Sequence, residues 1–231
     1  DEHGGWPVYY EVTEKRLALC VDLGLSLLKL GEEAVVLLAG FSLDGPSRKG
    51  LRRTQREFVK RGASFEVLPR ERVADMLPTL QLVSDDWLQS KATREKGFSL
   101  GRFDAEYLQH FPVAIVREAG HVVAFSNVWA GAPGSQLSMD LMRYSTAASS
   151  GVMEYLVIEL LLWGHAHGYA EFSLGMAPLS GLQGRALASL WNRAGHWLFR
   201  HGENFYNFKG LRQYKEKFDP VWEPRYLASP G

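Results

Sequence analysis

Two side chains of opposite charge, Asp140 and Arg143, stand three residues apart in the mostly apolar segment SMDLMRY at residues 138–144. A carboxylate can accept a proton during catalysis, and a guanidinium fork matches the geometry of a phosphate group. Alternation along a strand would place the two side chains on opposite faces, so a bulge or a strand end is needed to bring them together. An exposed ion pair of little energetic value is the competing interpretation.

A strongly basic stretch at residues 48–61 is the second candidate, because it holds seven cations and one acid in a chain whose formal net charge is zero. We expect it to be helical, and like charges four residues apart destabilise a helix. A polyphosphate partner would offset that cost and would make binding depend on salt. Arg48, Arg52 and Arg53 are therefore candidate contacts to nucleic acid or lipid phosphate, with a solvated surface as the alternative.

The third candidate is the stretch at residues 203–218, in which aromatic and basic side chains interleave. Such a surface can stack bases and neutralise phosphates. The same pattern also fits an amphipathic helix that packs its apolar side inward. The residues of this stretch that carry the first interpretation are Tyr206, Lys209, Arg212 and Lys217.

Composition limits the class of protein. The 231 residues can form one large domain or two small ones, and the single cysteine excludes an internal disulfide. The most apolar run, at residues 155–163, is far shorter than the roughly 20 residues that a bilayer span needs. No P-loop, nucleophile elbow, C-x-x-C motif or histidine spacing typical of metal ligands is present, so we expect neither metal nor cofactor. The first residue is not Met, and we expect a fragment of a longer protein.

The elements that must position these residues alternate between helix and strand. We expect helices at residues 14–29, 48–61, 70–96 with a break at Pro78, 151–167 and 184–200. We expect strands at residues 34–41, 64–68, 113–117, 121–129, 136–144, 170–175 and 221–227. An antiparallel meander followed by helix, strand, helix and strand predicts an α+β fold, in the order of a GNAT-like acyltransferase.

The helix-strand order at the start of the chain resembles the end of a similar unit. We therefore expect a tandem of GNAT-like folds in which the first copy is truncated. The predicted parts are residues 1–69 as the C-terminal part of the first fold, residues 70–97 as a connecting helical segment, and residues 98–231 as the second, catalytic fold.

Longer motifs carry a family resemblance. They are FSLGRFD at residues 98–104, DLMRY at 140–144, LGMAPLSG at 174–181, FYNFKGLR at 205–212, KEKF at 215–218 and WEPRYL at 222–227. The segments at residues 23–34 and 48–53 fit the same pattern. Together they resemble the C-terminal catalytic domain of MprF-type aminoacyl-phosphatidylglycerol synthases over nearly the whole chain.

The resemblance implies transfer of a lysyl or alanyl group from aminoacyl-tRNA to the glycerol hydroxyl of phosphatidylglycerol, which changes membrane charge and resistance to cationic peptides. It also implies an N-terminal transmembrane flippase part and a place at the cytoplasmic face of the bacterial inner membrane. Coenzyme A is not expected as the donor, because the place before the long helix, AASSG at residues 147–151, holds a single glycine.

Roles for individual residues follow as hypotheses. Asp140 would take the hydroxyl proton, Arg143 would hold the lipid phosphate, and Glu203 would hold the amino group of the donor amino acid. The tRNA end or the oxyanion would contact Tyr206, Lys209, Arg212 and Lys217, and the tRNA backbone or anionic head groups would contact Arg48, Arg52 and Arg53.

Two other functions fit the same sequence. One is a Fem-type tRNA-dependent transferase that acts on an amine of a peptidoglycan precursor. The other is a non-catalytic module that binds tRNA or lipid. Lipid extraction after incubation with labelled aminoacyl-tRNA separates these alternatives from the first.

Overall fold

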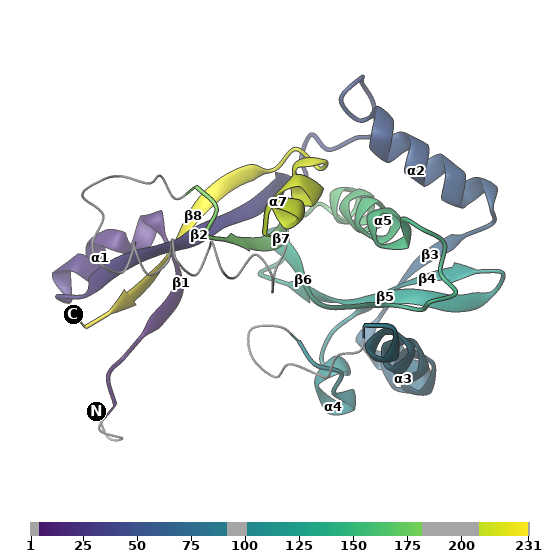
Figure 1. Ribbon diagram of the computed structural model, residues 1–231, viewed down its shortest axis with the longest axis horizontal. Coiled ribbons are helices and arrows are strands. Elements are labelled where there is room, and N and C mark those ends of the chain that lie inside the picture. Colours follow the sequence, from purple (N-terminus) through teal and green to yellow (C-terminus); the bar gives the residue numbers. More distant parts are fainter. Residues whose placement is uncertain (1–4, 92–100, 182–207, 231) are drawn as a thin grey trace. The chain divides into compact units, whose positions relative to one another are not determined.

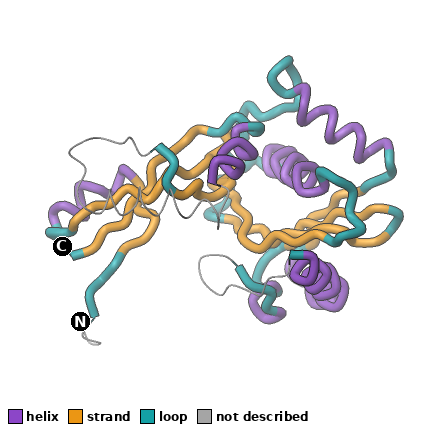
Figure 2. The backbone as a smooth tube through the Cα atoms, viewed as in Figure 1, coloured by secondary structure: helices purple, strands orange, loops and turns teal. Residues whose placement is uncertain are grey.

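The computed structural model describes residues 5–91, 101–181 and 208–230, and in α7 the side chains from residue 210 onward. The chain divides into two compact units (Figure 1). Unit 1 comprises Asp1–Val35 with Leu174–Gly231, and unit 2 comprises Val36–Ser173. Each unit combines strands with helices, as Figure 2 shows by colour, so the predicted α+β class is confirmed.

The sheet of unit 2 is an antiparallel meander extended by one parallel strand. Its strands are β3 (Ser64–Leu68), β4 (Val113–Glu118), β5 (His121–Ala130), β6 (Gln136–Tyr144) and the start of β7 (Glu171–Pro178). Each pairs with the next, and only β6 and β7 run parallel. Positive φ angles at Ala119 and Gly120 make the tight β4–β5 turn that a right-handed strand twist favours.

Helices cover both faces of this sheet. In Figure 1, α2 (Lys49–Lys60) and α5 (Val152–Ala166) lie on one face, and α3 (Val73–Ser90) and α4 (Ala105–Leu108) lie on the other. The short 3-10 helix η2 (Arg70–Arg72) leads into α3. The core under α3 contains fully buried leucines and Phe125, and the buried residues of α5 fill the other side. These two apolar layers hold β6 between them.

Unit 1 is built around three strands. Strand β8 (Val221–Ser229) lies between β1 (Tyr9–Thr13) and β2 (Ser26–Leu37) and is antiparallel to both. The helices of this unit are η1 (Glu14–Arg16), α1 (Leu17–Asp22) and α7 (Phe208–Glu216). A small core of Val12, Cys20 and Ala228 joins the strands to α1. Cys20 is buried as a packing residue.

Two predicted elements are wrong. The helix expected at residues 14–29 ends at Asp22, and β2 begins at Ser26 rather than at residue 34. Gly24 adopts φ +72°, which ends the helix, and pairing with β8 then overrides the helical spacing of the leucines. The break expected at Pro78 is absent from the structure, since α3 runs through it and buries residues on both sides of the proline in one core.

Other predicted elements are confirmed, among them the basic helix, the hairpin and the long apolar helix. The expected helix at residues 184–200 lies outside the described residues. The predicted division of the chain at residues 69 and 98 stays a prediction. Among the described residues, no helix combines the length and hydropathy required to cross a bilayer.

Candidate active site around Asp140

A bulge in β6 determines where Asp140 points. Ser126 pairs with Met142 and Val128 with Met139, so Asn127 alone faces two residues of β6, Asp140 and Leu141. The side-chain oxygen of Asn127 accepts hydrogen bonds from the backbone N–H of Leu141 at 2.7 Å and of Asp140 at 3.4 Å. A bulge of this kind re-aims the side chains beside it. Asn127 is fully buried, and no motif in the sequence indicates its role.

The Asp140 carboxylate is half-buried and is held by two donors. Its Oδ1 accepts from the backbone N–H of Gly101 at 2.8 Å, and its Oδ2 accepts from the Tyr107 hydroxyl at 2.8 Å. Burial and the nearby Asp140 carboxylate both raise the pKa of Tyr107. The carboxylate is therefore fixed by partners from a segment more than thirty residues earlier in the chain.

Helix α4 presents Tyr107 to Asp140. The Asp104 carboxylate caps this helix by accepting from the backbone N–H of Glu106 at 3.0 Å and of Tyr107 at 3.1 Å. The Tyr107 ring packs on Phe111, which in turn stacks on Trp129 with ring centroids 5.7 Å apart. The cap and the aromatic contacts leave the tyrosine little freedom.

A glycine is required at position 101 because the backbone there lies very close to the Asp140 side chain. A Cβ atom built on this residue would collide with the Asp140 carboxylate. The glycine of the FSLGRFD motif thus lets the backbone come near enough to donate its N–H. Gly101 and Asp140 belong to separate sequence motifs, and the fold brings them together.

Arg143 is buried on the same side of the sheet as the core residue Leu141. Its guanidinium lies 4.3 Å above the Trp87 ring of α3 and donates to the Met142 carbonyl oxygen at 2.9 Å. Helices α3 and α4 cover one face in Figure 1, so the contacts of Asp140 and Arg143 both come from that face. The bulge that the sequence required for the pair is present.

The turn before α5 is filled by carboxylates of the chain itself. The backbone N–H of Ser149 donates to Glu118 at 2.9 Å. Asp86 accepts from the Ser145 hydroxyl at 2.6 Å and from the Thr146 N–H at 2.7 Å. Both bonds lower the pKa of Asp86, and the bond from Ser145 has the larger effect. A pyrophosphate at this helix start would have to compete with two negative groups.

In unit 1, Arg212 is bound by the protein itself. Its guanidinium donates to Glu32 at 2.6 Å, lies 3.4 Å from the Glu216 carboxylate and stacks 4.1 Å above the Trp222 ring. Burial works to raise the pKa of Glu32, but hydrogen bonds from Arg212 and then Lys29 outweigh it and lower that pKa. These contacts join α7 to β2.

The remaining predicted residues of the C-terminal stretch are described only in part. The Lys217 ammonium lies 5.5 Å from the Tyr214 ring centroid. Lys209 belongs to α7, but its side chain lies outside the described residues, as do Glu203 and Tyr206 entirely.

Lys215 is a buried cation that the sequence did not single out. Its ammonium donates to the carbonyl oxygens of Gly175 at 2.9 Å and Met176 at 3.0 Å, at the end of β7. Burial lowers the pKa of Lys215 to about 8, against the attraction of Glu33 and Glu11. The KEKF motif offered only alternating charge, which does not distinguish a buried lysine from an exposed one.

The predicted basic contacts on α2 and at its N-cap, Arg48, have individual partners. Arg52 donates to the carbonyl oxygens of Leu43 and, at 3.0 Å, of Gly45. Arg53 forms a 2.8 Å ion pair with Glu57, and the Arg48 guanidinium lies 5.1 Å from the Phe41 ring centroid.

Comparison with known proteins gives a consistent result. The family described as "Phosphatidylglycerol lysyltransferase, C-terminal" matches residues 1–229. The phosphatidylglycerol lysyltransferase of Bacillus subtilis is 40% identical over 223 residues, and that of Staphylococcus aureus is 36% identical over 222 residues. Each match covers 96% of this chain and 26% of the relative, so the chain spans about a quarter of their length.

Solved structures agree with the fold. The C-terminal domain of a putative lysylphosphatidylglycerol synthetase from Agrobacterium fabrum gives a TM-score of 0.86 at 41% identity, over 100% of this chain and 69% of that one. L-PGS from Bacillus licheniformis gives 0.80 at 39% identity, over 99% and 69%. FemX, at 8% identity and a TM-score of 0.63 over 97% and 71%, shares the fold alone. The GNAT-like fold class predicted from the sequence is confirmed.

Proposed function

Because the chain belongs to the family of phosphatidylglycerol lysyltransferase C-terminal domains, we propose that it transfers a lysyl or alanyl group from aminoacyl-tRNA to the glycerol hydroxyl of phosphatidylglycerol. The relatives are phosphatidylglycerol lysyltransferases, which supports a lipid acceptor and a lysyl group. An aminoacyl ester is already activated, so the reaction needs a positioned proton acceptor more than a new source of energy.

The fixed Asp140 carboxylate is the observation that carries the proposal. In the proposed step, the lipid hydroxyl oxygen attacks the ester carbonyl carbon while Asp140 takes the hydroxyl proton. The bond from that carbon to the ribose oxygen then breaks, and the proton passes to the ribose oxygen of the released tRNA. A positioned base of this kind typically contributes about 10²–10⁴-fold in rate. Tyr107 and Gly101 orient the carboxylate for this role.

Other residues have supporting roles in this proposal. Arg143 binds the lipid phosphate, and its stacking on Trp87 holds the guanidinium plane in one orientation. Glu203 holds the donor amino group, and Tyr206, Lys209 and Lys217 contact the tRNA end or the oxyanion. The partners of Arg212 support a positioning role, in which it keeps α7 in place.

The wider setting belongs to the same proposal. The chain acts at the cytoplasmic face of the bacterial inner membrane, joined to an N-terminal transmembrane flippase part. There the product would change membrane charge and resistance to cationic peptides. The match covers 26% of the Bacillus subtilis relative, and the rest of that length is sufficient for such a part.

Lipid extraction tests the proposal. The protein is incubated with labelled lysyl-tRNA or alanyl-tRNA and with phosphatidylglycerol vesicles, and the lipids are separated. We expect labelled aminoacyl-phosphatidylglycerol, and a loss of at least about 100-fold in rate for Asp140→Asn with unchanged thermal unfolding. A near-normal rate for Asp140→Asn would remove this residue from the mechanism, and label on a peptidoglycan-precursor amine instead of lipid would favour the Fem-type reaction.

A further inference from the structure

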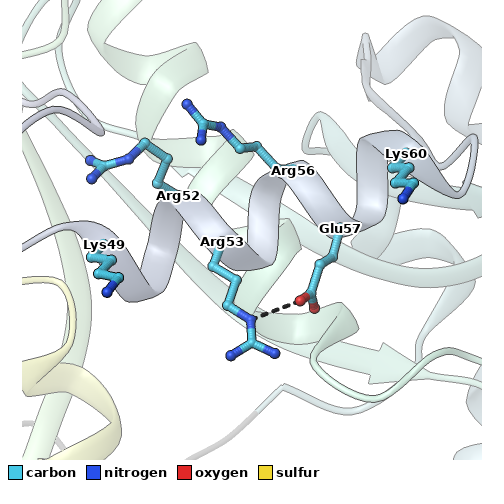
Figure 3. A pocket seen from close by; sticks show the side chains of 6 residues that line it. All are labelled: Lys49, Arg52, Arg53, Arg56, Glu57 and Lys60. Atoms are coloured by element: carbon cyan, nitrogen blue, oxygen red, sulfur yellow. Dashed lines mark hydrogen bonds and ion pairs between the residues drawn. The ribbon is translucent and has the colours of Figure 1, made fainter.

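We propose that one face of α2 docks the phosphodiester backbone of RNA, and that this RNA is the aminoacyl-tRNA. The proposal rests on the proposed function for the identity of the RNA. The cationic face of α2 consists of Lys49, Arg52, Arg53, Arg56 and Lys60, with Glu57 at its margin, and these six residues line an open pocket of about 430 Å³ (Figure 3).

The spacing gathers the charges on one side of the helix. At 3.6 residues per turn, the five cations fall within an arc of roughly 100° around the helix axis. At 1.5 Å per residue, the row from Lys49 to Lys60 is about 16 Å long. Figure 3 shows these side chains projecting outward from successive turns. The face is therefore a continuous basic row rather than scattered surface charge.

The opposite face of α2 is fixed to the protein. Leu51 and Phe58 are buried, and the Phe58 ring stacks on Tyr155 of α5 with centroids 4.8 Å apart. The Thr54 hydroxyl donates to Glu154 at 2.6 Å, and Gln55 donates to Glu159 at 3.3 Å. These contacts set the rotation of α2 about its axis and direct the cationic face away from α5.

The charges on this face are poorly matched by the protein itself. Glu57 is the acid of the helix, and it pairs with Arg53. Within the described part of the chain, no carboxylate pairs with Lys49, Arg56 or Lys60. Lys49/Arg53, Arg52/Arg56 and Arg56/Lys60 are like-charge pairs four residues apart, which destabilise a helix. The fold gains no ion pair from Lys49, Arg56 and Lys60 among the described residues, whereas a polyanion would supply partners for all three.

RNA fits the face better than a membrane does. A helix that lies in a bilayer surface inserts apolar side chains beside its cations. Here Leu51 and Phe58 face α5 and are each 2% exposed, and Val59, at 53%, is the single large apolar side chain that α2 leaves exposed, so the helix has little to insert. Arg52 is pre-oriented by the Leu43 and Gly45 carbonyl oxygens, and a guanidinium fork suits a fixed phosphate.

Salt-dependent binding of tRNA tests the inference. The variant Lys49→Gln/Arg56→Gln/Lys60→Gln removes three cations, and Lys15→Gln/Arg16→Gln/Arg70→Gln removes three exposed cations elsewhere as a matched control. With a slope of roughly 0.7–0.9 per phosphate, we expect the α2 variant to lose about 2–3 units of the slope of log affinity against log salt. Between 50 and 200 mM salt, the affinity of the unaltered protein should thus fall about 20- to 40-fold more than that of the variant.

Further readouts keep the result unambiguous. The α2 variant should unfold at the same temperature or higher, because like-charge pairs are removed, and the control variant should bind tRNA as the unaltered protein does. Equal tRNA binding by the α2 variant and the control would overturn the dock. Loss of binding to anionic vesicles in the α2 variant, with tRNA binding retained, would also overturn it and would assign the face to the membrane. The absence of tRNA binding by the unaltered protein would overturn it as well.

An unchanged KM for tRNA in the α2 variant, with lipid product still formed, would refute the dock alone. Tight, salt-sensitive tRNA binding without lipid product would refute the proposed function alone.

Discussion

At the scale of single residues, the Asp140 site depends on a few hydrogen-bonding groups that hold the carboxylate in place. Gly101 supplies a backbone N–H, Tyr107 supplies a hydroxyl, and Asn127 stabilises the bulge that turns Asp140 toward both. Hydrogen bonds to a charged group contribute about 1.5–3 kcal/mol each, so losing either donor should disturb the carboxylate more than a neutral contact would. The site is therefore sensitive to substitutions that change little volume.

Gly101→Ala tests this sensitivity. The added methyl group would strike the Asp140 carboxylate, so the carboxylate must move or lose its bond to the backbone. We expect kcat for lipid aminoacylation to fall by at least about tenfold, since small misplacements of a catalytic group are costly. Gly40→Ala, where an added Cβ meets no atom within 4 Å, is the matched control and should keep its rate. Equal rates for the two variants would contradict the role given to Gly101.

At the scale of elements, the two helices on one face of unit 2 are joined by aromatic packing. Phe58 of α2 is 2% exposed and stacks on Tyr155, whereas its neighbour Val59 is 53% exposed. Phe58→Ala should lower the free energy of unfolding by about 3–5 kcal/mol through the cavity it leaves. Val59→Ala, one position along, should change it by no more than about 0.5 kcal/mol. Denaturant unfolding measures both, and similar losses would show that α2 packs differently.

Lys215 makes the attachment of α7 to β7 dependent on pH. Its pKa is lowered to about 8 from the ordinary 10.5, so the unfolded chain binds more protons between these two values. The free energy of unfolding should therefore rise with pH across this window, by about 3 kcal/mol in all. Lys215→Met should lack that rise, while the exposed Lys15→Met should keep it. Denaturant unfolding at pH 8 and pH 10 measures the difference, and parallel changes in all three proteins would contradict it.

The elements also show what the sequence could and could not predict. Strands β3 and β6 match their predicted bounds, because apolar side chains and flanking turns mark them locally. The helix expected at residues 14–29 failed because its leucines fit either periodicity, and pairing with β8 decided between them. Asp140 could be selected from its motif, but its partners could not, since Tyr107 and Gly101 reach it only through the fold.

At the scale of the whole molecule, 26 basic and 26 acidic residues cancel, yet their distribution is uneven. The cationic face of α2 is open to a partner, while Lys215 and Arg225 are buried among carboxylates. Attraction to a polyanion is therefore local, and net charge alone would not reveal it.

The carboxylates at the start of α5 lead to a prediction for the intact enzyme. Because Glu118 and Asp86 already accept hydrogen bonds from the turn before that helix, a pyrophosphate group gains few donors there and meets two like charges. Acetyl coenzyme A at millimolar concentration should leave the rate of lipid aminoacylation and the KM for tRNA unchanged. Competitive inhibition against aminoacyl-tRNA would contradict this reading of the turn.

The same feature bears on which acyl donor the proposed reaction uses, a coenzyme A thioester or a charged tRNA. Because the chain supplies its own carboxylates at the start of α5, a coenzyme A thioester finds few backbone donors there. Under the proposed function, the rate of lipid aminoacylation in the cell would follow the supply of charged tRNA and hence the state of translation.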